Sequence, residues 1–495
     1  MLFCTLLAIT VTGCGGFWTK NDRDTKETET ETSTTVTEEA KEELRYEAED
    51  AVLSGNVHVE QKEDHSGEGY VANFSEEGDS VSFSVSVPET GFYDLVFMAA
   101  GLGGDKYNTV LLDGQNEGQL FTEESEEFIR SVLRKVYLEK GNHIITLQKD
   151  WGWLSLDCLL LEHTQKLDED TYKADITLAD QNADACTVRV MEYLGSIYGK
   201  QTLSGQYSLN GPAGPEMEII REASGEQPAI LAMDMMFYSH SAVAYVQEQK
   251  VIEWAEEYWE RGGLVSLSWH WFVPEEYKLG EWWQGYRTRN VNIDLGAILS
   301  GKDAEGYKLL MEDLDTMALC LRRLQEKGIP VLWRPLHEGS GGWFWWGSAG
   351  PECYKKLWHI MFEKFTEEYG LHNLIWIYSG MSREWYPGDE YVDIIGEDLY
   401  PGKHCYSAQG DKFLNALEYT DSNKMLVLSE IGALPDPDKM RIEGIRWLGC
   451  VTWGEQYLMD EEGKQSDTYI EKEQLKKFYQ HSDVITLDEL PSFKN

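Results

Sequence analysis

Two glutamates could carry acid–base chemistry, because each closely follows an apolar run with the composition of a buried strand. Glu338 comes shortly after residues 329–333, and Glu430 comes directly after residues 425–429. A pair of carboxyl groups, one giving a proton and the other attacking carbon or activating water, is what glycoside hydrolysis requires. The sequence therefore offers a candidate pair for sugar chemistry.

The surroundings of Glu338 are unusually aromatic. Four tryptophans and one phenylalanine lie within residues 333–346, and His337 precedes the glutamate. Indole rings stack on the C–H faces of sugars, and partial desolvation raises the pKa of a carboxyl toward that of a general acid. The alternative is a tryptophan-rich corner of the core beside a solvated glutamate, but Arg, His and Glu together are poor core chemistry.

The elements that would position these glutamates alternate between strand-like and helix-like over residues 179–490. Helical stretches such as 251–261, 309–327 and 354–369 separate apolar runs of strand length. Eight such runs with intervening helices predict a (β/α)8 TIM barrel, an α/β fold. The runs are 201–206, 229–234, 264–269, 330–334, 374–378, 392–396, 425–429 and 449–453.

Catalytic residues of such barrels lie at the C-terminal ends of the strands. Polar and aromatic residues that follow the predicted strands are Asp234, Trp269, His270, Trp271, His337, Glu338, Glu397, Asp398, Tyr400, Ser429, Glu430, Trp453 and Glu455. Among them we expect Glu338 and Glu430 to face one another as the catalytic pair. Glu397 and Glu455 are weaker candidates for a catalytic carboxyl group. Asp234 is open between a functional and a structural hydrogen-bonding role, since buried carboxylates are usually paired.

At residues 333–347, 385–402 and 428–432 the sequence resembles glycoside hydrolase family 26, which consists chiefly of β-mannanases. The resemblance covers about residues 179–490. It implies that Glu338 is the acid/base and Glu430 the nucleophile of a retaining reaction, with carboxyl groups about 5–5.5 Å apart. One departure lies beside the acid/base, where Gly339-Ser340 replaces the Met-Asn of many members.

The same resemblance implies the residues around the two carboxyl groups. His337 would orient Glu338 or touch the sugar, Tyr400 would hydrogen-bond the nucleophile, and Asp398 would support that region. Trp343 and Trp453 would stack on sugars, and the site would be lined by His270, Trp271 and Arg334. We expect Tyr400 and Arg334 near Glu430 to keep it ionised, and Glu338 to have the higher pKa of the two.

Residues 46–163 show period-two alternation with turns about every dozen residues, for example at 80–87, 93–98 and 143–147. This pattern predicts an antiparallel β-sandwich. Motifs at 46–50, 66–71, 87–93 and 154–159 resemble family 35 carbohydrate-binding modules.

That resemblance implies a structural Ca²⁺ held by Glu47, Glu49 and Asp157, whose hard oxygens suit calcium. The alternative is ordinary edge-strand carboxylates. It also implies a sugar platform, with Trp151, Trp153, Tyr70 and Asn108 as its residues. One of the two tryptophans could instead belong to the core.

The N-terminal residues 1–14 resemble a bacterial lipoprotein signal peptide in which Cys14 is lipidated. The usual basic region is missing, so the true start could lie upstream, and a fragment of an ordinary signal peptide is the alternative. Residues 15–45 are rich in Thr and Glu, which predicts a disordered tether. Residues 164–178 form a polar linker between the two predicted domains.

The charge and cysteine content narrow the possible partners. A formal charge of −44 over 495 residues repels nucleic acid and anionic lipid head groups. It suits a neutral polymer substrate, although solubility alone explains it as well. The eight cysteines include no CxxC pair, so neither a zinc site nor a disulfide framework is indicated.

We therefore expect an extracellular enzyme, held to the membrane only through a lipid anchor or secreted, monomeric, and without a catalytic cofactor. The expected reaction is endo-hydrolysis of β-1,4-bonds in mannan, glucomannan or galactomannan. The alternatives are a β-glucanase or β-1,3-xylanase on the same scaffold, or a non-catalytic glycan-binding lipoprotein.

Overall fold

A computed structural model describes residues 44–243, 245–246 and 249–494. The predicted signal peptide with Cys14, and all but the last two residues of the predicted tether, lie outside the described residues. In the part of the chain that is described, no helix is long and apolar enough to cross a membrane.

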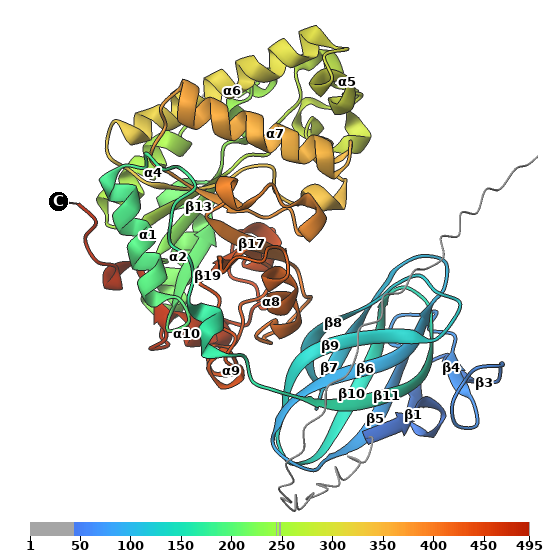
Figure 1. Ribbon diagram of the computed structural model, residues 1–495. Coiled ribbons are helices and arrows are strands. Elements are labelled where there is room, and N and C mark those ends of the chain that lie inside the picture. The colour runs from blue at the N-terminus through green and yellow to red at the C-terminus, as the bar shows by residue number, and fades with distance from the viewer. Residues whose placement is uncertain (1–43, 244, 247–248, 495) are drawn as a thin grey trace, which may run out of the picture. The chain divides into compact units, whose positions relative to one another are not determined.

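The N-terminal domain is an antiparallel β-sandwich (Figure 1). One sheet contains β1 (Leu44–Glu47), β3 (His58–Glu60), β4 (Tyr70–Ala72), β6 (Gly91–Gly101), β9 (Ile129–Leu138) and β11 (Leu154–Thr164). The other contains β2 (Val52–Ser54), β5 (Ser80–Val87), β7 (Lys106–Leu112), β8 (Gln115–Thr122) and β10 (Gly141–Trp151).

Alternation along the strands builds the core of the sandwich. In β5, Val81, Phe83, Val85 and Val87 are buried, while the serines between them are partly or fully exposed. Successive side chains of a strand point to opposite faces, so one face of β5 meets the second sheet and the other meets solvent.

The C-terminal domain is a closed barrel of eight parallel strands, as the sequence predicts. In spatial order the strands are β12 (Thr202–Tyr207), β13 (Ile230–Asp234), β14 (Leu264–Ser268), β15 (Val331–Arg334), β16 (Leu374–Tyr378), β17 (Ile394–Leu399), β18 (Met425–Ile431) and β19 (Gly449–Thr452). The barrel closes because β12 pairs with both β13 and β19. A short β20 (Val484–Ile485) adds to β12.

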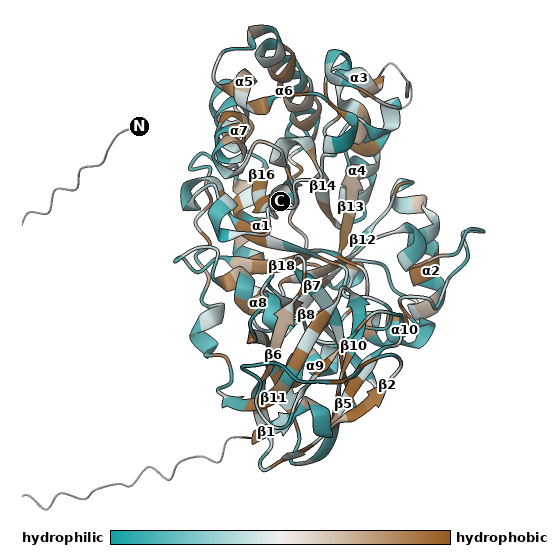
Figure 2. Cartoon of the chain, turned by 90° about the vertical axis from the view of Figure 1, so that its right-hand side faces the viewer, coloured by the Kyte–Doolittle hydropathy of each residue, from teal (hydrophilic) through white to brown (hydrophobic). Residues whose placement is uncertain are grey.

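Every residue of these eight strands is buried, as expected for parallel strands covered by helices. The helices are α1 (Ala185–Ile197), α2 (Pro215–Ser224), α3 (His240–Val243), α4 (Val251–Glu260), α5 (Leu295–Leu299), α6 (Ala304–Gln325), α7 (Pro351–Glu363), α8 (Gly410–Leu417), α9 (Pro437–Glu443) and α10 (Lys472–Tyr479). Figure 2 shows hydrophobic and hydrophilic residues interspersed along α6 and α7, as expected for helices that bury one face.

The predicted polar linker is partly ordered against the barrel. Residues Glu169–Tyr172 form a single 3-10 turn capped by Asp168. The Tyr172 hydroxyl accepts a hydrogen bond from the backbone N–H of Arg446, 3.0 Å away, and its ring lies against Tyr198. This end of the connection is therefore part of the barrel's surface layer.

Candidate active site

Glu430 lies near the C-terminal end of β18 and is almost completely buried. Its Oε2 accepts a hydrogen bond from the Tyr400 hydroxyl at 2.5 Å, and its Oε1 forms an ion pair with Arg334. A buried carboxylate is tolerated only when it is paired and hydrogen-bonded, and these two partners supply both conditions. They also hold the carboxyl group in one orientation.

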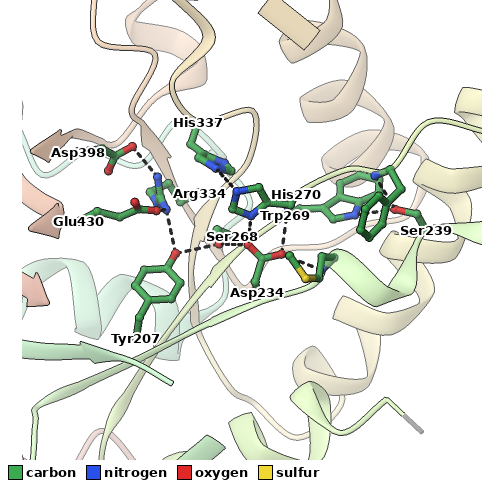
Figure 3. A network of polar contacts seen from close by, with 12 residues as sticks. Tyr207, Asp234, Ser239, Ser268, Trp269, His270, Arg334, His337, Asp398 and Glu430 are labelled. Carbon is green, nitrogen blue, oxygen red and sulfur yellow. Dashed lines mark hydrogen bonds and ion pairs between the residues drawn. The ribbon is translucent and has the colours of Figure 1, made fainter. Parts of the chain in front are cut away.

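Arg334, the last residue of β15, connects Glu430 to the other strand ends. Its guanidinium pairs with Asp398 at 2.7 Å and donates to the hydroxyls of Tyr207 at 2.8 Å and Ser379 at 3.0 Å. Arg334 is 1% exposed, so it supports the site from beneath. Figure 3 shows it between Glu430, Asp398 and Tyr207.

Glu338 lies on a strained turn after β15. Both Leu336, with φ of 50°, and Glu338, with φ of 54°, have left-handed backbone, which costs about 1 kcal/mol or more for such residues. The turn is fixed by its neighbours, because Glu338 N donates to the Ser379 carbonyl at 2.7 Å and Tyr354 donates to the Leu336 carbonyl at 2.9 Å.

Packing against Tyr354 explains why a glycine follows Glu338. A Cβ at Gly339 would lie 2.4 Å from the ring of Tyr354, the same ring that holds the Leu336 carbonyl. A larger side chain there would displace Tyr354 or the turn. The Gly339 that departs from many family members is thus matched to this chain's own packing.

Burial and like charge raise the pKa of both glutamates. The pKa of Glu338 is raised to about 8, first by burial and then by the charge of Glu430, against a hydrogen bond from Trp343 Nε1 to its Oε2 at 2.7 Å. Burial raises the pKa of Glu430 to about 7, while Arg334 and Tyr400 oppose the rise. Glu338 therefore binds the proton more tightly, and Glu430 is the first of the two to ionise.

Two histidines lie between these glutamates and Asp234. His270 Nδ1 is 2.5 Å from Asp234 Oδ2, and His270 Nε2 is 3.1 Å from His337 Nε2 (Figure 3). His337 is 1% exposed and His270 9%. Burial lowers the pKa of His337 well below its usual value, so this ring is neutral. His337 thus lies under the site and His270 lies closer to its surface.

The structure corrects the expected role of Trp271, whose side chain is fully buried and cannot line a ligand site. Its ring stacks on Trp269 at 4.3 Å, and its Nε1 donates to Asp313 at 2.8 Å. Trp345 and Trp346 are fully buried as well. The aromatic cluster is therefore largely core, because an indole whose N–H finds a partner is readily buried.

Trp343 and Trp453 remain available to a ligand. Trp343 is 49% exposed beside Glu338. Trp453 is partly buried, and its ring lies 4.5 Å from that of Tyr207. Tyr400, 36% exposed, lies against Tyr457. These aromatic rings surround the two carboxyl groups, as a sugar-binding surface requires.

Three residues of the site were not expected from the sequence. Tyr207 ends β12, Ser268 ends β14 and Ser379 follows β16, and their hydroxyls bond Arg334 or its partners. Their position at strand ends is a signal that could have identified them, but a lone hydroxyl is too common to single out.

The two carboxylates that ranked lower do not join the pair. Glu397 precedes Asp398 on β17 and is bonded by Tyr419, while Asp398 bonds Arg334. Tyr419 follows α8, and Lys412 of α8 also lies near this carboxyl, so Glu397 faces the helix layer. Glu455 is exposed at the start of a 3-10 turn.

The sandwich carries a row of exposed aromatic residues. Trp151, at the end of β10, pairs across the sheet with Tyr107 of β7, which in turn pairs with Phe121 of β8. Directly paired residues share a face of the sheet. Trp151 is 73% exposed and Trp153, just after it, 61%, so neither belongs to the core.

Two other residues expected on this platform are buried. Asn108 is fully buried and its side-chain oxygen accepts from Asp150 N at 3.2 Å, so it supports the chain before Trp151, while its Nδ2 is buried without a partner. Tyr70 is 7% exposed on β4, in the opposite sheet, where it donates to Glu60. Tyr70 is thus not part of this platform, because the sequence does not give the sheet assignment or the depth of a side chain, and the role of Asn108 stays a prediction.

Two of the three expected calcium ligands, Glu47 and Asp157, meet at Ser66, and the third, Glu49, bonds the backbone of the residues that follow. The Ser66 hydroxyl donates to Glu47 at 2.6 Å and lies 2.9 Å from Asp157. Glu49 Oε1 accepts from backbone N–H groups, and its Oε2 is buried without a partner. Across the described residues no group of three or more His, Cys, Asp or Glu is arranged to hold a metal ion, so calcium stays a prediction.

Comparison with known proteins agrees with both domains. Residues 179–489 match the model of glycosyl hydrolase family 26, and residues 44–164 match carbohydrate binding module family 35. A mannan endo-1,4-beta-mannosidase of Thermothelomyces thermophilus is 35% identical over 454 residues, 91% of each chain. Mannan endo-1,4-beta-mannosidase B of Piromyces sp is 33% identical, over 90% of this chain and 77% of that protein.

Solved structures give the same result. A Podospora anserina GH26-CBM35 β-(1,4)-mannanase has a TM-score of 0.63 at 33% identity and covers 91% of this chain and 99% of that chain. With a barrel of the expected topology, paired carboxyl groups at its strand ends and a family match over most of its length, the chain belongs to glycosyl hydrolase family 26.

Proposed function

We propose that this protein hydrolyses internal β-1,4-mannosidic bonds of mannan, glucomannan or galactomannan with retention of configuration. The observation that carries the proposal is the unequal pair of buried glutamates. Glu430 is held by a cation and a hydroxyl, whereas Glu338 has the higher pKa. The names of the mannan-cleaving relatives support the choice of polymer.

Each residue then has a role in two steps. Glu430 attacks the anomeric carbon while Glu338 protonates the departing glycosidic oxygen, which gives a glycosyl-enzyme. Glu338, now ionised, takes a proton from water, and that water releases the sugar from Glu430. Arg334 and Tyr400 stabilise the Glu430 carboxylate before attack and when it leaves. Neither step requires a cofactor.

The first test compares reducing-sugar release from β-1,4-mannan by the wild type and by Glu430→Ala. Losing the nucleophile is expected to lower kcat by about 10⁴- to 10⁶-fold. Glu455→Gln is the matched control, because Glu455 is an exposed carboxylate after β19 and should hydrolyse mannan at the wild-type rate. No release from mannan by the wild type would overturn the proposal and favour a glycan-binding protein.

A second substrate separates the two glutamates. An aryl β-mannoside with a dinitrophenolate leaving group needs no proton from Glu338, so Glu338→Ala should form the glycosyl-enzyme rapidly and then hydrolyse it slowly. A burst of dinitrophenol is the expected readout. Glu430→Ala should show no burst, and a burst there would contradict its role as the nucleophile.

A panel of polymers decides the substrate class. Mannan and glucomannan should be cleaved at least tenfold faster than β-glucan or β-1,3-xylan. Faster cleavage of β-glucan or xylan would replace mannan as the substrate and leave the two-glutamate mechanism in place, since the fold alone does not fix the substrate.

We also propose that the sandwich binds polysaccharide through Trp151 and Trp153 and that calcium stabilises it. The support for calcium is the meeting of Glu47 and Asp157 at Ser66 and the unpartnered Oε2 of Glu49, which bonds the backbone just after Ser66. A chelator should lower the Tm, and Ca²⁺ should restore it where Mg²⁺ does not. An unchanged Tm would rule out the metal.

Anchoring through Cys14 is likewise a proposal, based on the sequence of residues 1–14. Expression in a bacterial host with labelled palmitate would label the wild type and leave Cys14→Ser unlabelled. Secretion of unlabelled wild-type protein would refute the lipid anchor and support an ordinary signal peptide.

A further inference from the structure

Asp234, at the end of β13, is surrounded by four hydrogen-bond donors. Its Oδ1 accepts from the backbone N–H groups of Met236 at 2.8 Å and His270 at 3.0 Å. Its Oδ2 lies 2.8 Å from the Ser268 hydroxyl and 2.5 Å from His270 Nδ1. Both lone-pair regions of each oxygen are therefore filled. Burial alone would raise the pKa of Asp234, but His270 and these hydrogen bonds hold the pKa below its usual range, so the carboxylate is ionised.

One hydrogen-bond chain links His337 to His270 and His270 to Asp234, and the ionised Asp234 decides its direction. One proton is shared between His337 Nε2 and His270 Nε2. If His270 donated it, neutral His337 would carry its own proton on Nδ1, which is buried and has no partner among the described residues. That nitrogen lacks a partner in either tautomer, but ionised Asp234 can only accept, so His270 carries a proton on Nδ1 and its Nε2 is left as an acceptor. His337 therefore donates to His270, and His270 carries its proton on Nδ1 and donates to Asp234.

The second chain begins at the nucleophile's partner. Arg334 donates to the Tyr207 hydroxyl at 2.8 Å, Tyr207 donates to Ser268 at 2.8 Å, and Ser268 donates to Asp234. An arginine can only donate and an ionised carboxylate can only accept, so the two hydroxyls between them both donate toward Asp234. Figure 3 shows both chains meeting at Asp234.

We propose that Asp234 is a positioning residue, the common acceptor that sets the direction of two hydrogen-bond chains, one reaching Arg334 beside Glu430 and the other reaching His337 beside Glu338. It touches neither glutamate. Its effect on catalysis passes through the orientation of Arg334 and through the ring proton of His270, the less buried of the two histidines. The inference rests on the proposed hydrolysis for its kinetic part only.

The change Asp234→Asn reverses this arrangement with almost no change in volume. The new amide oxygen must replace Oδ1, because two backbone N–H groups point at that atom. The amide nitrogen then faces Ser268 and His270 and donates to both. His270 must accept at Nδ1 and carry its proton on Nε2, and Ser268 must donate toward Tyr207 instead of accepting from it.

The experiment combines ¹⁵N NMR of histidine rings with kinetics on mannan oligosaccharides. The ring-nitrogen shifts of His270, assigned with His270→Gln, should report Nδ1–H in the wild type and Nε2–H in Asp234→Asn. kcat should fall about 10- to 100-fold, the range seen when a group that orients a functional side chain is lost, and KM should change less.

Asp234→Ala separates a positioning role from a structural one. It removes the acceptor without adding a donor, so its kcat should be equal to or higher than that of Asp234→Asn, although its stability should be lower. A purely structural role gives the same order, Asn above Ala, for both stability and kcat.

Asp393→Asn is the matched control. Asp393 is also a buried carboxylate that accepts two backbone N–H bonds, from Ala179 at 2.6 Å and Trp376 at 2.7 Å, but it precedes β17 at the other end of the barrel. It should lower the Tm and leave kcat and the His270 tautomer unchanged. An unchanged His270 tautomer in Asp234→Asn would overturn the inference even if the wild type failed to cleave mannan.

Discussion

The barrel mouth and one end of the sandwich are both rich in tryptophan, but the side chains have different roles in the two places. In the barrel, Trp271, Trp345 and Trp346 are fully buried, and their indole N–H groups donate to Asp313 or to backbone carbonyls. In the sandwich, Trp151 and Trp153 are largely exposed. The same residue type serves as scaffold in one region and as contact surface in the other.

A high local content of tryptophan therefore indicates a functional site, but it does not identify the residues that contact the ligand. Trp346 bonds the His337 carbonyl, 2.8 Å away, and so helps to shape the turn that carries Glu338. Only Trp343, in the same stretch, is substantially exposed. The buried tryptophans of the barrel thus affect catalysis mainly by fixing the backbone. The exposed tryptophans of the sandwich fix no such turn, and their rings are accessible to a polymer.

The largest expected contrast between the regions is in stability. Trp271→Ala removes a buried indole and leaves Asp313 without its 2.8 Å partner, and large-to-small changes of this kind cost about 3–5 kcal/mol. Trp153→Ala, at a site 61% exposed, should stay within about 0.5 kcal/mol of the wild type. Denaturant or thermal unfolding measures both, and equal losses would erase the distinction.

A smaller effect is expected in the pH dependence of Trp343→Phe. The bond from Trp343 Nε1 lowers the pKa of Glu338, so removing it should raise that pKa. Because Glu338 must be protonated in the free enzyme to act as an acid, the basic limb of kcat/KM should move to higher pH. The acid limb, set by Glu430, should stay in place, and a shift of the basic limb to lower pH would contradict the assignment.

The smallest effect on chemistry is expected for Trp151→Ala and Trp153→Ala. Hydrolysis of short soluble mannan oligosaccharides should equal that of the wild type, while retention on insoluble mannan should fall. Stacking on an exposed ring contributes about 1 kcal/mol, or a several-fold change in affinity. Pull-down on insoluble mannan measures the retention, and a loss of soluble-substrate activity would give these residues a catalytic role that the sandwich is not expected to have.

The sequence sufficed for the barrel because buried parallel strands are continuous apolar runs whose order follows the chain. Glu338 and Glu430 could be selected because strand ends meet at one edge of such a barrel. The exposure of Trp271 could not be predicted, since it depends on Asp313 of α6, a partner 42 residues away. On β17, the register is irregular between Glu397 and Asp398, so simple alternation of side chains does not predict which of the two points into the barrel.

The sandwich was harder to read at the level of single residues. Its alternating strands were recognisable, but which sheet a strand joins depends on pairings between distant segments, such as β4 with β11. Tyr70 was misplaced for that reason. Tyr107 and Phe121 were missed because their alignment with Trp151 exists only across three paired strands.

The left-handed backbone at Glu338 has a consequence for how this chain could be improved. Glycine adopts that conformation freely, so the fold alone would be better served by glycine at position 338, and only the carboxyl group justifies keeping glutamate there. A substitution that stabilises the fold by relaxing this turn would therefore lower the catalytic rate. Stabilising substitutions are better placed on surfaces remote from residues 336–338.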